Sequence, residues 1–273
     1  MTLDLSALDR HEGHIAFAFS GGKDSLACAY LLRDHLHRMT VYHVSTGDQM
    51  QEVIDIVDHV RGMAPNFVTI RTDKEAWVRQ HGLPSDLVPH SSHQLGQEMR
   101  ESPVRLVSRY DCCFYNLMLP NHERIKADGN TLIIRGTKLS DMKRVPFRSG
   151  EVKDGVELFL PIEDWDDAKV FAYLREVGAP IAPVYAEAGV VHTPECMRCS
   201  AWLNESLALY LRRRYPEAFH DYAMRLQAIA GAIGPSVQNL QRELGAVAKA
   251  VQIAGIPELP APAGQSAQAE GVA

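Results

Sequence analysis

The sequence has 273 residues, 46% of them hydrophobic and 23% charged, with a formal net charge of −6. These values fit one large α/β domain with an appendage, and the negative charge argues against broad nonspecific binding to nucleic acid. There is no apolar run of about 18 residues and no secretory signal pattern, so we expect a cytoplasmic protein that does not cross a membrane.

The first predicted element is a buried strand over 15–19, followed by the segment Ser20-Gly21-Gly22-Lys23-Asp24-Ser25 and then an apolar helix. A strand that turns through two glycines into a helix directs backbone N–H groups and the helix N-terminus at one spot, which attracts a phosphate. Gly21 and Gly22 allow positive φ or close approach, and Lys23 adds a mobile positive charge. The spacing differs from that of an ordinary P-loop, so a standard P-loop ATPase or GTPase is not expected.

This segment resembles the PP-loop of the adenine-nucleotide α-hydrolases, which include ATP pyrophosphatases, tRNA-thiolating enzymes and the PAPS/APS reductases. The resemblance implies that the loop holds the pyrophosphate of ATP while a nucleophile attacks the α-phosphate. It also implies a catalytic role for Lys23. The nucleotide-binding candidates of the loop are Ser20, Gly21, Gly22, Lys23, Asp24 and Ser25.

Two further strands are predicted over 40–45 and 66–71, with a helix over 49–63 between them. Strands that alternate with helices predict an α/β fold with a doubly wound, mostly parallel sheet flanked by helices. Ligands of such sheets bind beyond the carboxyl ends of the strands. Gly47 and Asp48, which follow the second strand, should therefore face the same crevice as the PP-loop.

Magnesium is an expected companion of the nucleotide. Asp24 and Asp48 are candidate Mg²⁺ ligands, because this hard cation prefers carboxylate and phosphate oxygens. Asp24 could equally stabilise the N-terminus of the helix after the loop.

Residues 81–103 are polar and contain two prolines, and we interpret them as a surface loop or a lid over the site. His81, His90 and His93 do not have the spacing of a defensible metal site, so we expect ordinary loop histidines.

A helix is predicted from about Tyr110 to Ala127, and a fourth strand over 131–135 opens onto the segment 136–144. This segment resembles the family's post-strand loop, in which a glycine, basic residues and a serine approach the phosphate or sulfate of the nucleotide. The resemblance assigns nucleotide contacts to Gly136 and Ser140, and catalytic contacts to Lys138 and Arg144. An exposed basic loop is the alternative.

The rest of the chain is predicted to be scaffold and appendage. A helix entered from 159–165 runs through Glu176, with Asp164 as a candidate N-cap. We expect a PP-loop nucleotide-binding catalytic domain over 1–204 and C-terminal helices over 205–254, separated near Gly234-Pro235. A disordered Pro/Ala/Gly/Gln-rich tail is expected over 255–273.

Four of the five cysteines form two pairs, Cys112-Cys113 and Cys196-x-x-Cys199, about eighty residues apart. Paired cysteines in a cytoplasmic chain more often bind metal or carry out redox chemistry than form disulfides. The arrangement resembles the signature of assimilatory APS reductases, which implies a [4Fe–4S] cluster held by these four residues. Zinc and free or redox-active thiols are the alternatives.

The resemblance to the sulfonucleotide reductases breaks at two points. Those enzymes use a cysteine in a C-terminal Glu-Cys-Gly-x-His tail, and no cysteine follows Cys199 in this sequence. They also usually carry a degenerate loop where this chain keeps Ser-Gly-Gly-Lys-Asp-Ser. Both departures favour cleavage of ATP between the α- and β-phosphates, with adenylation of an acceptor in sulfur metabolism or sulfur transfer.

Two alternatives remain open. One is an APS/PAPS reductase that uses an external thiol, and the other is a non-catalytic nucleotide-binding subunit of a sulfur-modification complex. The partners implied are an adenine nucleotide and a sulfur-donor protein or thioredoxin-like reductant. Binding to nucleic acid and formation of a homodimer are left open.

Overall fold

The computed structural model describes residues 5–85, 87–88, 92–99, 104–141 and 148–254. Arg144, His90 and the segment 255–273, for which the sequence raised expectations, lie outside the described residues. No helix among the described residues is long and apolar enough to cross a membrane.

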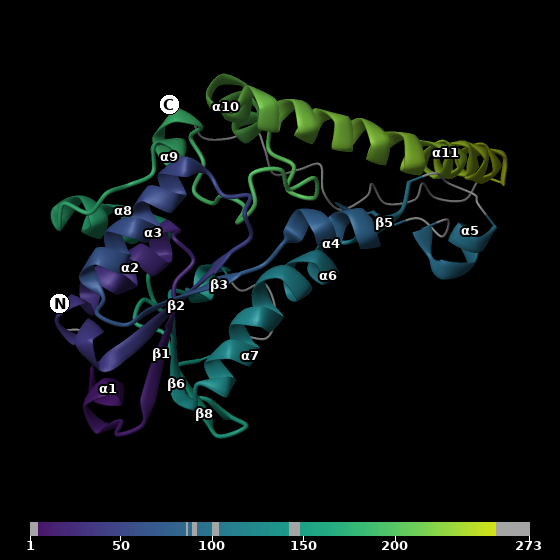
Figure 1. Ribbon diagram of the computed structural model, residues 1–273. Coiled ribbons are helices and arrows are strands. Elements are labelled where there is room, and N and C mark those ends of the chain that lie inside the picture. The colour runs from purple at the N-terminus through teal and green to yellow at the C-terminus, as the bar shows by residue number, and fades with distance from the viewer. Residues whose placement is uncertain (1–4, 86, 89–91, 100–103, 142–147, 255–273) are drawn as a thin grey trace.

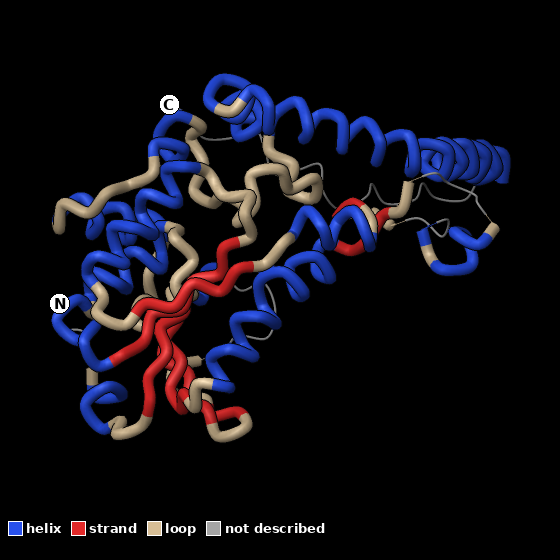
Figure 2. The backbone as a smooth tube through the Cα atoms, viewed as in Figure 1, coloured by secondary structure: helices blue, strands red, loops and turns tan. Residues whose placement is uncertain are grey.

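A six-stranded sheet lies at the centre of the fold, in the order β3-β2-β1-β6-β8-β7 (Figure 2). All neighbouring strands are parallel except β7 and β8. The strands of this sheet are β1 (His14–Ala18), β2 (Met39–Ser45), β3 (Phe67–Arg71), β6 (Asn130–Arg135), β7 (Val152–Lys153) and β8 (Val156–Phe159). A second, two-stranded parallel sheet pairs β4 (Leu83–Ser85) with β5 (Leu106–Ser108).

Helices cover both faces of the main sheet (Figure 1). The helices described are α1 (Ser6–Arg10), α2 (Lys23–Leu31), η1 (Arg33–Arg38), α3 (Gln51–Met63), α4 (Lys74–His81), α5 (Gln94–Glu98), α6 (Arg109–Cys113), η3 (Phe114–Met118), α7 (Leu119–Ala127), η4 (Leu139–Asp141), α8 (Asp167–Glu176), α9 (Pro183–Glu187), α10 (Glu205–Arg214) and α11 (Pro216–Ala254).

The alternation of side chains along the strands explains the two layers. Phe17 and Ile134 face a large core shared with α2, α3 and α8. Ala16 and Ile133 face the opposite way and pack with Tyr42 and with Ile125 of α7. Successive residues of a strand point to opposite faces, so these strands are apolar on both sides, as expected for a sheet buried between two helical layers. The predicted doubly wound fold is confirmed.

Three expectations about individual elements need correction. The N-cap of α8 is Asp166, whose Oδ1 accepts a hydrogen bond of 2.8 Å from the backbone N–H of Lys169, and not Asp164. The C-terminal helices are separated at Tyr215, and α11 continues through Gly234-Pro235. The described part of 81–103 includes β4 and α5, so it is not wholly a loop.

The predicted helix from Tyr110 to Ala127 is present, but it contains a π-helical turn. The turn η3 joins α6 to α7 directly after Cys113. Such turns are rare and frequently occur at functional sites. Within this one, the buried side chain of Asn116 donates to the carbonyl of Cys112 at 2.9 Å and fixes the backbone beside the first cysteine pair.

Candidate functional site

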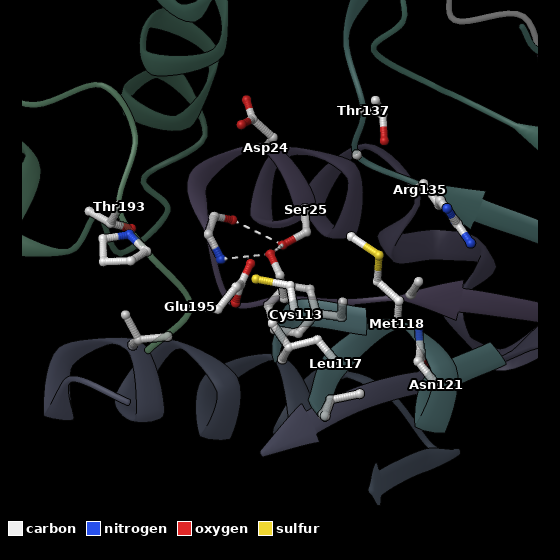
Figure 3. A pocket seen from close by; sticks show the side chains of 18 of the residues that line it. Asp24, Ser25, Cys113, Leu117, Met118, Asn121, Arg135, Thr137, Thr193 and Glu195 are labelled. Atoms are coloured by element: carbon white, nitrogen blue, oxygen red, sulfur yellow. Dashed lines mark hydrogen bonds between the residues drawn. The ribbon is translucent and has the colours of Figure 1, made fainter. Parts of the chain in front are cut away.

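The PP-loop has the geometry of an anion-binding turn. Strand β1 ends at Ala18, and α2 begins at Lys23, so the loop lies at the carboxyl edge of the sheet. Gly21 has a φ of +90°, and a Cβ there would meet Val53 at 2.9 Å, which explains the need for glycine. The hydroxyls of Ser20 and Ser25 lie 3.1 Å apart, and Ser25 donates to the carbonyl of Gly22 at 3.0 Å (Figure 3).

Tyr185 holds the start of α2 from the other side. The backbone N–H of Lys23 donates to the Tyr185 hydroxyl at 3.2 Å. Burial raises the pKa of this tyrosine, so it stays protonated as a neutral hydroxyl. The backbone N–H of Lys23, at the helix N-terminus, therefore donates to a neutral hydroxyl. A bound anion could take the place of this hydroxyl as the hydrogen-bond acceptor.

The loop lysine belongs to a buried charge network. Lys23 Nζ lies 2.8 Å from Asp24 Oδ2 and 2.8 Å from Asp167 Oδ1. Lys138 Nζ contacts Asp24 Oδ1 at 2.7 Å and Asp141 Oδ2 at 3.0 Å. The side chains of Lys23 and Lys138 are 2% and 0% exposed, so both ammonium groups depend on these carboxylates for their solvation.

The pKa directions within the network follow from these contacts. Burial acts to lower the pKa of Lys138, but Asp24 and Asp141 outweigh it, and the pKa lies above its ordinary value. Burial acts to raise the pKa of Asp167, but contact with Lys23 and the charge of Lys138 hold it below its ordinary value. Lys138 and Asp167 are therefore both charged at neutral pH.

A cavity of about 780 Å³ opens over the loop (Figure 3). It reaches from the PP-loop to Cys113 and the π-helical turn, and it continues to the end of β6. The lining residues that bear on function are Ser20, Gly22, Lys23, Asp24, Ser25, Tyr42, Cys113, Phe114, Leu117, Met118, Asn121, His122, Arg135, Gly136, Thr137, Tyr185, His192 and Glu195. The nucleotide loop and one of the paired cysteines thus face a single cavity.

The four paired cysteines lie near one another in the fold, and Cys113 lines the cavity. The charge of Cys199 raises the pKa of both Cys112 and Cys113, and also that of Cys196, which requires these thiols to be neighbours. Burial is the largest contribution in each case and raises the pKa of Cys112 and of Cys196 to about 12. Their role as one set of metal ligands stays a prediction from the sequence.

Lys74 places a buried positive charge beside this quartet. Its ammonium lowers the pKa of all four thiols, although burial outweighs it. Burial acts to lower the pKa of Lys74 itself, but Cys196 and Asp48 raise it above its ordinary value. The ammonium of Lys74 therefore opposes the effect of burial on these thiols without reversing it.

A family model described as the phosphoadenosine phosphosulfate reductase domain matches residues 14–199, which is more than half of the chain. The chain belongs to the phosphoadenosine phosphosulfate reductase family. The family is part of the PP-loop adenine-nucleotide α-hydrolase superfamily, so the expectation from the sequence is confirmed.

Solved structures that match the chain include a phosphoadenylyl-sulfate (PAPS) reductase from Candida auris in a phosphate complex. It is 16% identical, with 66% of this chain and 80% of that chain covered and a TM-score of 0.47. An NH₃-dependent NAD synthetase from Campylobacter jejuni is 12% identical, with 81% and 88% covered and a TM-score of 0.42. An NMN synthetase from Francisella tularensis is 12% identical, with 80% and 90% covered and a TM-score of 0.39. The comparison with curated proteins found no match.

Within this reductase-family fold, Asp48 does not lie where the sequence suggested. Its side chain is 0% exposed, and its carboxylate pairs with Lys74 at 2.5 Å and with Arg198. The Asp48 carbonyl also accepts from the backbone of Met197 at 2.7 Å. Asp48 organises the turn that carries Cys196 and Cys199, and it does not line the cavity that contains the PP-loop. Gly47, with a φ of +74°, supplies the bend before it and does not line the cavity.

The post-strand loop also differs in detail from the expectation. Lys138 is buried against Asp24 and does not line the cavity. Ser140 donates to the carbonyl of Trp165 at 3.4 Å, outside the cavity, because η4 turns it away. Gly136 does line the cavity, and a Cβ there would lie 2.7 Å from the backbone of Ser25, so its glycine lets β6 approach α2.

Several site residues were not anticipated. Asp167 is the first residue of α8 and reaches the loop lysine from a distant segment, and Tyr185 was treated as scaffold. Glu195 projects into the cavity, where enclosure by the protein raises its pKa to about 7. Arg135 had been regarded only as the end of a strand. The one sequence signal that could have indicated Glu195 and Arg135 is their adjacency to Cys196 and Gly136.

Proposed function

We propose that this protein cleaves ATP between the α- and β-phosphates and transfers the adenylyl group to an acceptor in sulfur metabolism or sulfur transfer. The observation that carries the proposal is the single cavity shared by an intact PP-loop and Cys113. A nucleotide bound at the loop would lie beside the cysteine quartet, where sulfur or electron chemistry could use the activated acceptor.

The loop supplies the groups that a polyphosphate needs. The backbone N–H groups at the start of α2 and the hydroxyls of Ser20 and Ser25 can donate to phosphate oxygens. The ammonium group of Lys23 can leave Asp24 and Asp167 and contact the phosphates instead. In that position its charge would stabilise the departing pyrophosphate. The reaction forms a bond from the acceptor oxygen to the α-phosphorus and breaks the bond to the β-phosphate. Pyrophosphate leaves, and the acceptor proton passes to water.

The carboxylates of the charge network around Lys23 and Lys138 suit a magnesium ion. Among the described residues, one group of potential ligand atoms lies within 4.8 Å of one another, and it consists of Asp24, Asp167 and His192. The two carboxylates offer the oxygen donors that Mg²⁺ prefers. They would hold the ion once Lys23 turns towards the phosphates, and the ion would neutralise charge on the pyrophosphate.

The cysteine quartet is assigned to an iron–sulfur cluster because its spacing in the sequence resembles that of the assimilatory APS reductases. Each thiolate of a [4Fe–4S] cluster binds a different iron, and zinc is the alternative for four cysteine ligands. Cys112, Cys113, Cys196 and Cys199 would hold such a cluster, which supplies electron or sulfur storage when bound. Lys74 would offset its negative charge.

The decisive experiment measures the products of ATP turnover on anaerobically purified protein, with water as the default acceptor. We expect AMP and pyrophosphate in equal amounts, and a loss of at least tenfold in Lys23→Ala. Lys126→Ala, which alters an exposed lysine of α7, is the matched control and should retain the wild-type rate. Formation of ADP and phosphate would contradict the proposal.

Two further assays of the anaerobically purified protein test the two alternatives. Release of sulfite from a sulfonucleotide in the presence of a thiol reductant, without pyrophosphate from ATP, would establish a reductase. Binding of ATP without turnover in the presence of candidate acceptors would indicate a non-catalytic subunit.

A further inference from the structure

Helix α11 carries an apolar stripe that continues beyond the part of the helix packed on the rest of the chain. The stripe begins with Tyr222 and Ile229, which are buried, and α11 then extends away from the main sheet (Figure 1). The bulky apolar residues that continue it are Ile233, Val237, Leu240, Leu244 and Val247. Because they recur every three or four residues, they lie on one side of the helix.

The second half of this stripe is exposed. Val237, Leu240, Leu244 and Val247 are 38%, 60%, 56% and 42% exposed. Their spacing of three, four and three residues places them at the a and d positions of a heptad repeat. A seam of this kind is narrower than the apolar face of a helix that packs on a globular core, and it fits a second helix. We call these four residues the α11 seam.

The α11 seam is complementary to a copy of itself. Its residues read Val-Leu-Leu-Val in both directions, so valine meets valine and leucine meets leucine in a parallel or an antiparallel pair. The flanking e and g positions hold Ser236, Gln241, Glu243 and Ala248. With one charged residue among these four positions, two copies bring little like charge together.

The charge pattern of the same segment argues against other occupants. Between residues 226 and 248 the charged residues are Arg242 and Glu243, whose charges cancel. A helix that lies on an anionic membrane or on nucleic acid needs an excess of Lys and Arg on its polar face. The sequence after α11 has Ile256, Leu259 and Val272 as its bulky apolar residues, which do not form a second heptad seam.

We propose that the α11 seam pairs with the α11 seam of a second copy of this chain. This inference goes beyond the proposed function, because the seam residues do not line the PP-loop cavity. The seam spans about 15 Å of helix at 1.5 Å per residue. Such a strip is smaller than a standard protein interface, so the dimer dissociates on dilution.

Sedimentation equilibrium of the full chain over roughly 1 to 100 μM tests the pairing. We expect wild type to shift from monomer to dimer across this range. Leu244→Lys places a charge in the seam and should weaken the dimer at least tenfold. Leucine and lysine have similar helix propensities, so α11 should remain helical, and circular dichroism of the variant checks this.

A matched control adds the same charge elsewhere on the helix. Gln238→Lys alters an exposed position of α11 outside the seam and should dimerise as wild type does. The inference fails if wild type is monomeric throughout, if Leu244→Lys dimerises like wild type, or if Gln238→Lys loses the dimer equally.

Two further measurements separate this inference from other readings. Wild type should not sediment with vesicles of neutral and anionic phospholipid, and seam-dependent binding to them would overturn the pairing of two copies. Lys23→Ala should dimerise as wild type does, because the PP-loop takes no part in the seam. The proposed function fails separately, if Lys23→Ala leaves pyrophosphate release unchanged.

Discussion

Lys74 Nζ lies 2.5 Å from Asp48 Oδ2, and the two side chains are 2% and 0% exposed. This pair joins the start of α4 to the turn that carries the second cysteine pair, because Asp48 also contacts Arg198. The pair therefore links the cysteine site to the main sheet, and we expect its removal to destabilise both.

Asp48→Asn is expected to destabilise the protein by about 3–5 kcal/mol, because it leaves Lys74 and Arg198 without their buried counter-charge. Urea unfolding followed by circular dichroism measures the loss. Asp58→Asn breaks the exposed pair with Arg61 and serves as the control, with an expected loss of less than about 1 kcal/mol. Equal losses in the two variants would show that the buried pair has no special role.

Iron content should distinguish the quartet from the remaining cysteine. Replacement of any one of Cys112, Cys113, Cys196 or Cys199 by serine should reduce iron and acid-labile sulfide several-fold in anaerobically purified protein. Cys28→Ala removes a thiol that is wholly buried in the main core, and it should keep the metal content of wild type at some cost in stability. A colourless wild-type protein that contains zinc would contradict the cluster assignment.

The stability contributed by Glu75 should depend on pH. Burial acts to raise the pKa of Glu75, but Lys74 and Arg225 outweigh it and lower the pKa to about 2 from 4.5. A lowered folded-state pKa gives stability that is complete above pH 4.5 and is lost as the pH falls towards 2. Because the side chain is 33% exposed, we expect Glu75→Gln to cost only about 1–2 kcal/mol at pH 7.

The measurement for Glu75 is the difference in unfolding free energy between wild type and Glu75→Gln at several pH values. The difference should shrink on acidification over the range in which both proteins fold. Glu123→Gln, at an exposed position of α7, is the control and should show no such trend. A difference that grows towards low pH would reverse the assigned sign.

Gly136→Ala tests the close approach of β6 to the helix of the PP-loop. The added Cβ would lie 2.7 Å from the backbone of Ser25, so the loop must shift, and ATP affinity should fall at least tenfold together with a loss of stability. Gly62→Ala places the same methyl group on α3 with nothing within 4 Å, and it should be neutral or stabilising by up to about 1 kcal/mol. Unchanged ATP binding in Gly136→Ala, measured by calorimetry, would argue against this packing role.

The sequence was sufficient for the sheet and for the PP-loop, because both depend on local patterns. The strand, two glycines and helix around Gly21 specify a turn without reference to distant residues, and apolar runs such as 15–19 indicate strands buried on both sides. The grouping of Cys112-Cys113 with Cys196 and Cys199 rests on resemblance to a known signature and stays a prediction.

Long-range electrostatic contacts could not be predicted in the same way. Asp48 follows a strand at the correct edge of the sheet, but its role depends on Lys74 and Arg198, which lie 26 and 150 residues away. Asp167 likewise reaches Lys23 only because α8 packs on α2. A single sequence does not reveal which carboxylate a buried cation selects.

The attachment of Lys23 and Lys138 to three aspartates has a consequence for ligand selection. These carboxylates already satisfy both ammonium groups, so we expect chloride or orthophosphate to gain little by approaching them. Only a ligand that delivers several negative charges together, with a cation for the carboxylates it displaces, gains from the exchange.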